Sequence, residues 1–330
     1  MARERTTFNI LWTALARSLT GGILSSFYEL PDEGRGRLEI IAADVFRLDD
    51  GLIGDFAETL SYKDFFSLGS RLEYPGGDRD RITRRFVEFL RDDKNLDDRY
   101  LFKRVLQFVV EGDDAVSRVL RLAGDIRKRE GATLFGKYGV FELAEDGRIT
   151  NVDFPIYVPS SVEQAERQIE IFWEKYKHLG GPHDRVLRRC SQRGRSVVLI
   201  KPHAFHTYDY DFRFGSIIDA FSRAGGSIIG AKVLVFTREQ LDMFYKPHVR
   251  KKWYEPELVP EMTGGRTLAL LYEGSNIQEK LREALTKVVR PAFADSYDPT
   301  KTAAHASDPK ERGCVEREMR AVNFGENYLP

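Results

Sequence analysis

Cysteine is nearly absent from this chain. Its 330 residues contain only two, Cys190 and Cys314, which lie far apart and show no paired spacing. The sequence therefore excludes a disulfide framework and a cysteine-based zinc site. Cysteine usage of this kind is typical of a reducing compartment, so we expect a cytoplasmic protein.

Long apolar runs and net charge are also missing. No segment approaches the roughly 20 apolar residues that span a bilayer, and Asn9, Thr13 and Arg17 interrupt the apolar core that a signal peptide would need. The 51 basic and 51 acidic residues balance, so no overall field attracts nucleic acid or an acidic membrane. We expect a soluble protein with neither partner, and we interpret the one basic cluster, residues 185–195, as a solvated linker.

What the chain has is length and apolar residues. Hydrophobic residues make up 42% of it and aromatic residues 12%, enough for substantial cores. A chain of this length exceeds one ordinary compact domain. The Gly- and Arg-rich stretch between two strongly patterned regions marks the boundary. We predict domains at 1–176 and 195–330, joined by a basic linker at 177–194.

The two halves share a faint internal repeat. In the second half, residues 196–202 read as a buried strand, 214–225 as an amphipathic helix ending at glycine, and 227–236 as another strand. Thr237 is then well placed to cap a further helix, with Gln240 three residues on. The first half repeats this order, and in both halves a later strand runs through Glu-Gly into a helix. The pattern predicts an α/β (α+β) protein of two tandem split βαβ, ferredoxin-like βαββαβ sandwiches.

The segment HASDPKE at 305–311 carries the main chemical signal. Asp308, Pro309 and Glu311 are typical of a helix start, so we expect His305 in the loop just before a helix. A phosphoryl-accepting histidine needs one ring nitrogen free and the other held by an acceptor, and Glu316 on the following helix would suit that role. From spacing alone, an ordinary capping loop explains the same residues.

Two motifs favour the phosphoryl-accepting histidine over an ordinary capping loop. SVVLIKPHAF resembles the opening strand of nucleoside diphosphate kinases, which ends in Lys-Pro, and TAAHASDP resembles their N-x-x-H-G-S-D-S active-site segment. The resemblance covers essentially the whole second half. It implies that His305 is the phosphohistidine, that Glu316 orients its ring, and that Ser307 is the neighbouring serine. Mg²⁺ would arrive on the nucleotide phosphates.

The resemblance also implies a nucleotide site. Lys201 would contact phosphate, Tyr245 would lie beside the histidine, and Arg282 would bind phosphate. Trp253 falls where the family stacks a phenylalanine on the base, and Leu258 lies near the apolar residue beneath it. Plain core packing remains the alternative for the two aromatic residues.

The chain departs from the family before His305. Residues 283–304 are shorter than the family's segment and lack its G-T-I-R-G-like turn, with Thr286 and Arg290 available as substitutes for the lost threonine and arginine. Thr302 and Ala306 replace the usual asparagine and glycine. The stretch from Pro202 to Phe214, with His203 and His206, is a longer loop than usual.

The first half departs further from the same family. The counterparts of the arginine, the histidine, the glutamate and the strand-end lysine are Phe135, Tyr157, Gln168 and Trp12. A tyrosine cannot form the phosphoramidate of a reversible transfer. We therefore predict that this half is a catalytically dead copy that packs on the active half or offers a docking surface.

The leading hypothesis is phosphoryl transfer from a nucleoside triphosphate to a nucleoside diphosphate through phospho-His305. The alternative is a pseudoenzyme that serves as a nucleotide sensor or protein-interaction scaffold. A transfer onto a protein partner is a third possibility, for which the sequence offers no direct sign. A homo-oligomer, or a protein partner bound through the first domain, fits either leading hypothesis.

Overall fold

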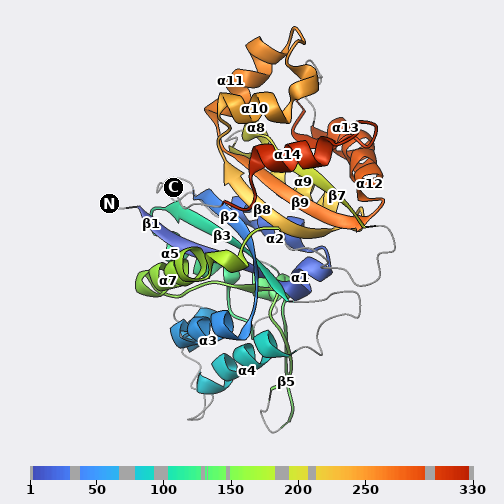
Figure 1. The fold of residues 1–330 in the computed structure, drawn as a ribbon. Helices are drawn as coiled ribbons and strands as arrows, with labels where there is room; N and C mark the ends of the chain where they lie inside the picture. The colour runs from blue at the N-terminus through green and yellow to red at the C-terminus, as the bar shows by residue number, and fades with distance from the viewer. Residues whose placement is uncertain are drawn as a thin grey trace. The chain divides into compact units, whose positions relative to one another are not determined.

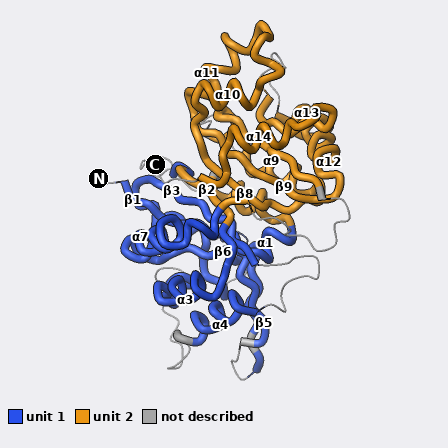
Figure 2. Tube along the Cα trace, in the orientation of Figure 1, with its two compact units in different colours: residues 1–17, 29–40, 46–180 blue, residues 18–28, 41–45, 181–330 orange. Residues whose placement is uncertain are grey.

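The computed structural model describes residues 3–29, 38–66, 79–92, 103–127, 131, 133–145, 149–182, 193–206, 213–293 and 302–326. The chain divides into two compact units (Figure 2). Unit 1 comprises residues 1–17, 29–40 and 46–180, and unit 2 comprises 18–28, 41–45 and 181–330. The main division at Gly180/Gly181 falls inside the predicted linker, most of which lies outside the described residues. The sequence-based division did not anticipate that residues 18–28 and 41–45 group with unit 2.

The sheet of unit 2 has the strand order β10-β7-β9-β8. Its strands are β7 (Arg193–Ile200), β8 (Ser227–Leu234), β9 (Thr267–Ser275) and β10 (Ala304–Ala306). Every neighbouring pair is antiparallel. In chain order this arrangement is 4-1-3-2, the order of a βαββαβ sandwich. The predicted fold of the second half is confirmed.

Helices fill the connections of unit 2 (Figure 1). They are α8 (Pro202–His206), α9 (Arg213–Ser222), α10 (Arg238–Phe244), α11 (Val259–Gly264), α12 (Ile277–Ala284), α13 (Arg290–Phe293) and α14 (Cys314–Val322). Thr237 caps α10 in a reciprocal capping box with Gln240, as predicted. The stretch after Lys201 is not the expected loop, because α8 occupies its beginning. Residues 207–212 lie outside the described residues.

Unit 1 repeats this topology with the order β2-β3-β1-β6. The strands of this sheet are β1 (Glu4–Leu11), β2 (Glu39–Arg47), β3 (Arg104–Gly112) and β6 (Ile156–Tyr157), and residues 41–45 of β2 are those that group with unit 2. A separate hairpin consists of β4 (Val140–Leu143) and β5 (Ile149–Asp153). The helices are α1 (Trp12–Ala16), α3 (Asp50–Thr59), α4 (Arg79–Arg91), α5 (Ala115–Ala123), α6 (Leu134–Tyr138) and α7 (Val162–Ile169). The chain therefore uses one sheet order twice, and the predicted tandem fold is confirmed.

Helix α2 (Thr20–Ser25), an N-terminal segment of unit 2, packs on α9 through glycine. A Cβ atom on Gly21 would lie 2.4 Å from both the Asp219 backbone nitrogen and the Gly215 carbonyl oxygen. Reciprocally, a Cβ on Gly215 would lie 2.6 Å from the Gly21 carbonyl oxygen. Because these neighbours are backbone atoms, only glycine permits this separation of the two helices.

We expect Gly21→Ala to destabilise the protein by about 1–3 kcal/mol, since the added methyl group must push two helix backbones apart. The matched control is Gly54→Ala in α3, where a Cβ meets nothing within 4 Å. That control should be neutral or stabilising by roughly 0.4–1 kcal/mol. Calorimetric unfolding of both variants measures the difference. Equal melting behaviour would show that the α2–α9 contact is not close-packed.

Candidate active site

His305 lies at the centre of β10, an edge strand that pairs antiparallel with β7 and places His305 opposite Leu199. Its side chain is 17% exposed. The prediction that His305 lies in a loop directly before a helix is wrong, because residues 309–313 form turns and α14 begins only at Cys314. Asp308 accepts a hydrogen bond from the Lys310 backbone N–H at 2.9 Å, so it stabilises the turn and does not cap α14.

The ring of His305 is held by Glu318 of α14. The distance from Nε2 of His305 to Oε1 of Glu318 is 2.9 Å. The second carboxylate oxygen accepts a hydrogen bond from the Ser307 hydroxyl at 2.6 Å, and that hydroxyl accepts one from the Val197 N–H at 2.8 Å. Glu318 is only 2% exposed. A carboxylate at Nε2 favours the tautomer with its proton there. Nδ1 has no hydrogen-bond partner among the described residues.

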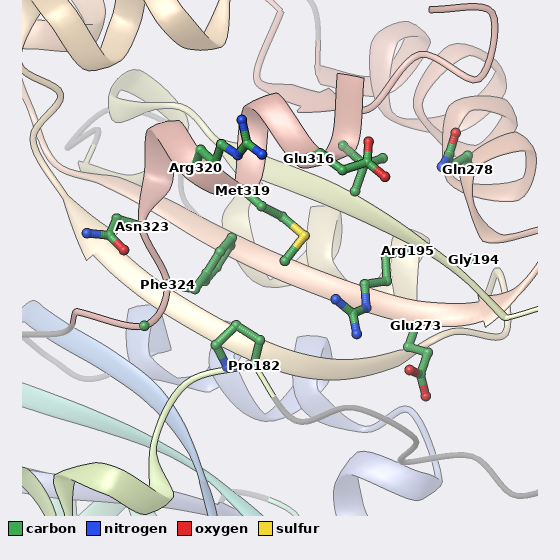
Figure 3. A pocket seen from close by; sticks show the side chains of 12 residues that line it. Pro182, Gly194, Arg195, Glu273, Gln278, Glu316, Met319, Arg320, Asn323 and Phe324 are labelled. Carbon is green, nitrogen blue, oxygen red and sulfur yellow. The ribbon is translucent and has the colours of Figure 1, made fainter. Parts of the chain in front are cut away.

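Glu316, which the sequence suggested for this role, contacts a different part of unit 2. It is exposed and lines a cavity of about 850 Å³ with Arg195, Gln278 and Met319 (Figure 3). The sequence-based choice is therefore corrected to Glu318. It assumed the family's spacing after the histidine, whereas the turns before α14 place the helix residue that meets the ring two positions later.

Tyr245, at the end of α10, lies beside His305 as expected. The ring centroids of Tyr245 and His305 are 5.6 Å apart, with an interplanar angle of 75°. The ring centroid of Phe244 lies 5.0 Å from that of His305. The Tyr245 hydroxyl is buried and has no hydrogen-bond partner among the described residues. Burial, followed by the carboxylates of Glu261 and Glu318, raises the pKa of Tyr245 well above its ordinary value. Tyr245 is therefore a neutral phenol between two acidic groups.

Lys201 follows β7 and is 3% exposed. Its ammonium lies 3.3 Å from Oε2 of Glu261, a residue of α11. The other carboxylate oxygen of Glu261 contacts Nδ1 of His203. Burial opposes the charge on Glu261, but the contacts to His203 and Lys201 outweigh it and lower the pKa of Glu261. The predicted phosphate-binding lysine thus has a partly buried counter-charge.

Arg282 of α12 reaches the segment after His305. Its guanidinium donates to the Ala306 carbonyl at 3.1 Å and lies 3.3 Å from Oδ2 of Asp308. Arg290 begins α13, and its Nε is buried without a partner among the described residues. Burial, followed by the charge of Arg282, lowers the pKa of Arg290, while Asp308 opposes that effect. Arg282 is therefore paired with Asp308, and Arg290 lies within electrostatic influence of both.

Three predicted site residues remain: Trp253, Leu258 and Thr286. The ring centroid of Trp253 lies 5.5 Å from that of His248, and Leu258 is a buried residue at the end of the π-helical turn Tyr254–Leu258. Thr286 is exposed, and its hydroxyl donates to the carbonyls of Arg282 and Glu283 on its own helix. The structure therefore gives no support to a site role for Thr286.

In unit 1, Tyr157 of β6 occupies the sheet position that His305 of β10 has in unit 2. It is fully buried, donates to Oδ2 of Asp64 at 2.8 Å, and accepts from Nε2 of Gln168 at 2.8 Å. Burial, followed by Asp64, raises the pKa of Tyr157 well above its ordinary value. The phenol is satisfied and neutral, so it offers no nucleophile.

Aromatic side chains fill the space around Tyr157. Phe86 of α4 stacks on it at 5.2 Å, and Phe56 packs edge-on at 5.0 Å. The prediction that Trp12 takes the place of the strand-end lysine is wrong, because Trp12 begins α1 as Pro202 begins α8. The counterpart of Lys201 is Leu11, whose N–H donates to Pro155 as that of Lys201 donates to Ala303. Trp12 stacks on Phe89 at 4.2 Å. Phe135, at the position of the expected arginine, is also buried. None of the four residues predicted as losses, Trp12, Phe135, Tyr157 and Gln168, has a charged side chain.

Comparison with known proteins identifies the family that the second unit resembles. Residues 194–324 match the family model "Nucleoside diphosphate kinase". Solved structures that resemble the chain include an orthorhombic crystal form of the Aquifex aeolicus nucleoside diphosphate kinase, with 26% identity, 40% of this chain and 95% of that one covered, and a TM-score of 0.33. Another is the halophilic enzyme from Halobacterium salinarum in complex with CDP, with 22% identity, coverage of 39% and 87%, and a TM-score of 0.35.

The second unit thus contains a domain of the nucleoside diphosphate kinase family. Among the described residues, no helix is long and apolar enough to cross a membrane. The same residues contain no group of three or more His, Cys, Asp or Glu side chains that could hold a metal ion.

Sequence reasoning missed three polar residues of this site: Glu318, Glu261 and His248. Glu318 carries a usable signal, because it is four residues before Val322 and three after Val315, both buried, and so lies on the inner face of α14. Glu261 carries none, since Lys201 and His203 lie about 60 residues before it in the chain, and His248 lies in a short turn without a periodic pattern.

We expect Glu261→Gln to lower the pKa of Lys201, because a buried ammonium that loses its carboxylate favours its neutral form. Nitrogen NMR of the lysine side chains follows this titration directly. The matched control is Glu279→Gln at the exposed start of α12, which should leave Lys201 unchanged. An unaltered Lys201 titration in Glu261→Gln would contradict the assigned ion pair.

Proposed function

We propose that unit 2 is a nucleoside diphosphate kinase that transfers the γ-phosphoryl group of a nucleoside triphosphate to a nucleoside diphosphate by a ping-pong mechanism. The observation that carries the proposal is the buried Glu318 bonded to Nε2 of His305, with no described partner at Nδ1. Such an arrangement suits a nucleophile whose second nitrogen is fixed by a base.

In the first step, Nδ1 of His305 attacks the γ-phosphorus. A P–N bond forms while the bond from that phosphorus to the β,γ-bridging oxygen breaks, and the diphosphate leaves. The Nε2 proton remains on the ring and donates to Glu318, which stabilises the cationic imidazole of the phosphohistidine. In the second step, a terminal oxygen of the acceptor diphosphate attacks the same phosphorus, and His305 is regenerated.

Cationic side chains surround the proposed position of the phosphates. Lys201 and Arg282 would neutralise phosphate oxygens, and Arg290 would take the place of the arginine that the shortened segment lacks. Its support is the buried, unpartnered Nε beside Arg282. Mg²⁺ would enter as part of the nucleotide substrate, bridging phosphate oxygens.

Around the histidine, Tyr245 would donate its unpartnered hydroxyl to a phosphate oxygen, and Ser307 would keep Glu318 aligned. Trp253 would stack on the base above Leu258. Stacking accepts any base, so this proposal includes no base preference.

Unit 1 would have no part in the chemistry. Its buried Tyr157–Asp64–Gln168 hydrogen-bond network and the aromatic side chains packed around it support a structural role for that copy.

Incubation of the purified full-length protein with γ-labelled ATP tests the proposed nucleophile. We expect acid-labile label on the wild-type protein and none on His305→Asn. Glu318→Gln should slow labelling by roughly 10²–10⁴-fold, since the ring loses its charged orienting group.

Glu316→Gln is the matched control, because Glu316 is an exposed residue of the same helix. This variant should label at the wild-type rate. Acid-labile label on the His305→Asn protein would contradict the proposal. Nucleotide binding without any label on the wild-type protein would instead favour the pseudoenzyme.

A second test concerns the substitute arginine. We expect Arg290→Ala to reduce kcat/KM for the acceptor diphosphate by roughly 10²–10³-fold, the usual effect of losing one group that stabilises charge in the transition state. Steady-state kinetics measures it. Lys287→Ala is the control, because Lys287 is exposed and ion-paired with Glu283. Equal kinetics for the two variants would remove Arg290 from the site.

A further inference from the structure

One carboxylate near the candidate site has no part in the proposed chemistry. Glu261 of α11 divides its two oxygens between the residues on either side of Pro202. Oε2 lies 3.3 Å from Nζ of Lys201, and Oε1 contacts Nδ1 of His203 in α8. The Glu261 side chain is 18% exposed, and that of Lys201 is 3% exposed. The Lys201–Glu261–His203 cluster therefore joins a buried ammonium to a carboxylate that two partners hold.

The ammonium of this cluster lies on the face of the sheet that carries His305. The pairing of β7 with β10 places Leu199 opposite His305. The Lys201 N–H continues that pairing, because it donates to the Ala303 carbonyl at 3.0 Å. Side chains two residues apart on a strand point to the same face, so Lys201 shares the face of Leu199 and of His305.

The carboxylate of Glu261 also lies close to the phenol of Tyr245. Burial, followed by Glu261, raises the pKa of Tyr245, and the ring of Tyr245 packs 5.6 Å from that of His305. Glu261 therefore adds a negative charge near the place where the proposed function puts the transferred phosphate. Such a charge repels phosphate, so the carboxylate disfavours nucleotide binding unless another effect compensates.

The compensating effect is on Lys201. A buried ammonium without a counter-charge favours its neutral form, which cannot neutralise phosphate. An ammonium has three N–H donors, so Lys201 can keep one on Glu261 while another donates to a phosphate oxygen. The lysine stem is flexible, and a carboxylate that His203 also holds selects one direction for its ammonium. Such alignment matters for the rate, since small displacements of a charged group are costly in catalysis.

We propose that Glu261 is a positioning residue of the phosphoryl transfer, which with His203 as its anchor fixes the Lys201 ammonium toward the transferred phosphate. The inference rests on the proposed function for the place of the phosphate and for the role of Lys201. Glu261 makes and breaks no bond, and it acts only through the lysine. Its removal takes away an attraction of phosphate through Lys201 and a direct repulsion, so binding changes little. The transition state needs the aligned ammonium, so the maximal rate falls.

Single-turnover phosphorylation of the full-length protein by γ-labelled ATP and Mg²⁺, over a range of ATP concentrations, tests this. Glu261→Gln, Lys201→Gln and the protein with both changes form a double-mutant cycle with the wild-type protein. The label is normalised to the amount of folded protein, which circular dichroism measures. The matched control is Glu279→Gln, at the exposed start of α12.

We expect Glu261→Gln to lower the maximal rate by roughly 10–100-fold, while the half-saturating ATP concentration changes by less than about threefold. Lys201→Gln should lose roughly 10²–10³-fold. The double variant should be no slower than Lys201→Gln, because Glu261 acts through the lysine. Glu279→Gln should keep the wild-type rate. A purely structural defect would instead lower the folded fraction and would add to the loss from Lys201→Gln.

His203→Leu is a second variant that keeps the Lys201–Glu261 pair and removes only its anchor. It should slow phosphorylation by roughly three- to tenfold, and this loss should vanish in the Lys201→Gln background. It carries the test if Glu261→Gln fails to fold. A wild-type rate in Glu261→Gln, or losses that multiply in either double variant, would overturn this inference and leave the proposed function intact. Absence of label on the wild-type protein would overturn both.

Discussion

The buried carboxylate of Glu318 is the interaction on which the site depends. An isolated carboxylate away from water is costly, so a residue that is 2% exposed persists as an anion only where donors satisfy it. Ser307 and His305 are those donors. Because the Ser307 hydroxyl also receives the Val197 N–H, one side-chain cluster fastens β10, β7 and α14 together. The same hydrogen bonds therefore orient the His305 ring and hold α14 against β10 and β7.

Local patterning was enough to predict the fold. Apolar runs, Gly-terminated helices and the Thr237 capping box are short-range signals, and the internal repeat ordered them into two βαββαβ units that the sheet orders confirm. The site was harder to predict because it depends on where one helix begins. Gly313, in the left-handed region at φ 73°, ends the turn before α14. That turn moves the orienting role from Glu316 to Glu318, since two residues along a helix rotate a side chain about 200° to the other face.

The charges around the site are set by contacts that sequence spacing does not reveal. Lys201 meets Glu261 across 60 residues of chain. Arg290 follows Arg282 by eight positions, which in a regular helix would separate them by about 80° around the axis. The π-helical turn Leu285–Val289 lies between them and alters that angle. The two guanidinium groups influence one another electrostatically. A shortened segment has thus kept a second cation near Asp308 by a change in helix type.

Comparison of the two units shows how the fold can persist when the catalytic residues are absent. In unit 1, Tyr157, Gln168 and Asp64 form a hydrogen-bonded network, so the Tyr157 hydroxyl at the position of the lost histidine is paired, whereas Oδ1 of Asp64 has no partner among the described residues. Pairing of the Tyr157 phenol avoids the cost of an unsatisfied buried hydroxyl, and the phenylalanines of α3 and α4 pack around it. Such packing stabilises the sheet only because no substrate has to enter. In unit 2, the unpartnered Tyr245 hydroxyl and the Arg290 Nε carry the opposite penalty. The two units differ at the histidine position itself: one ring nitrogen of His305 has no partner among the described residues, whereas the Tyr157 hydroxyl both donates and accepts hydrogen bonds.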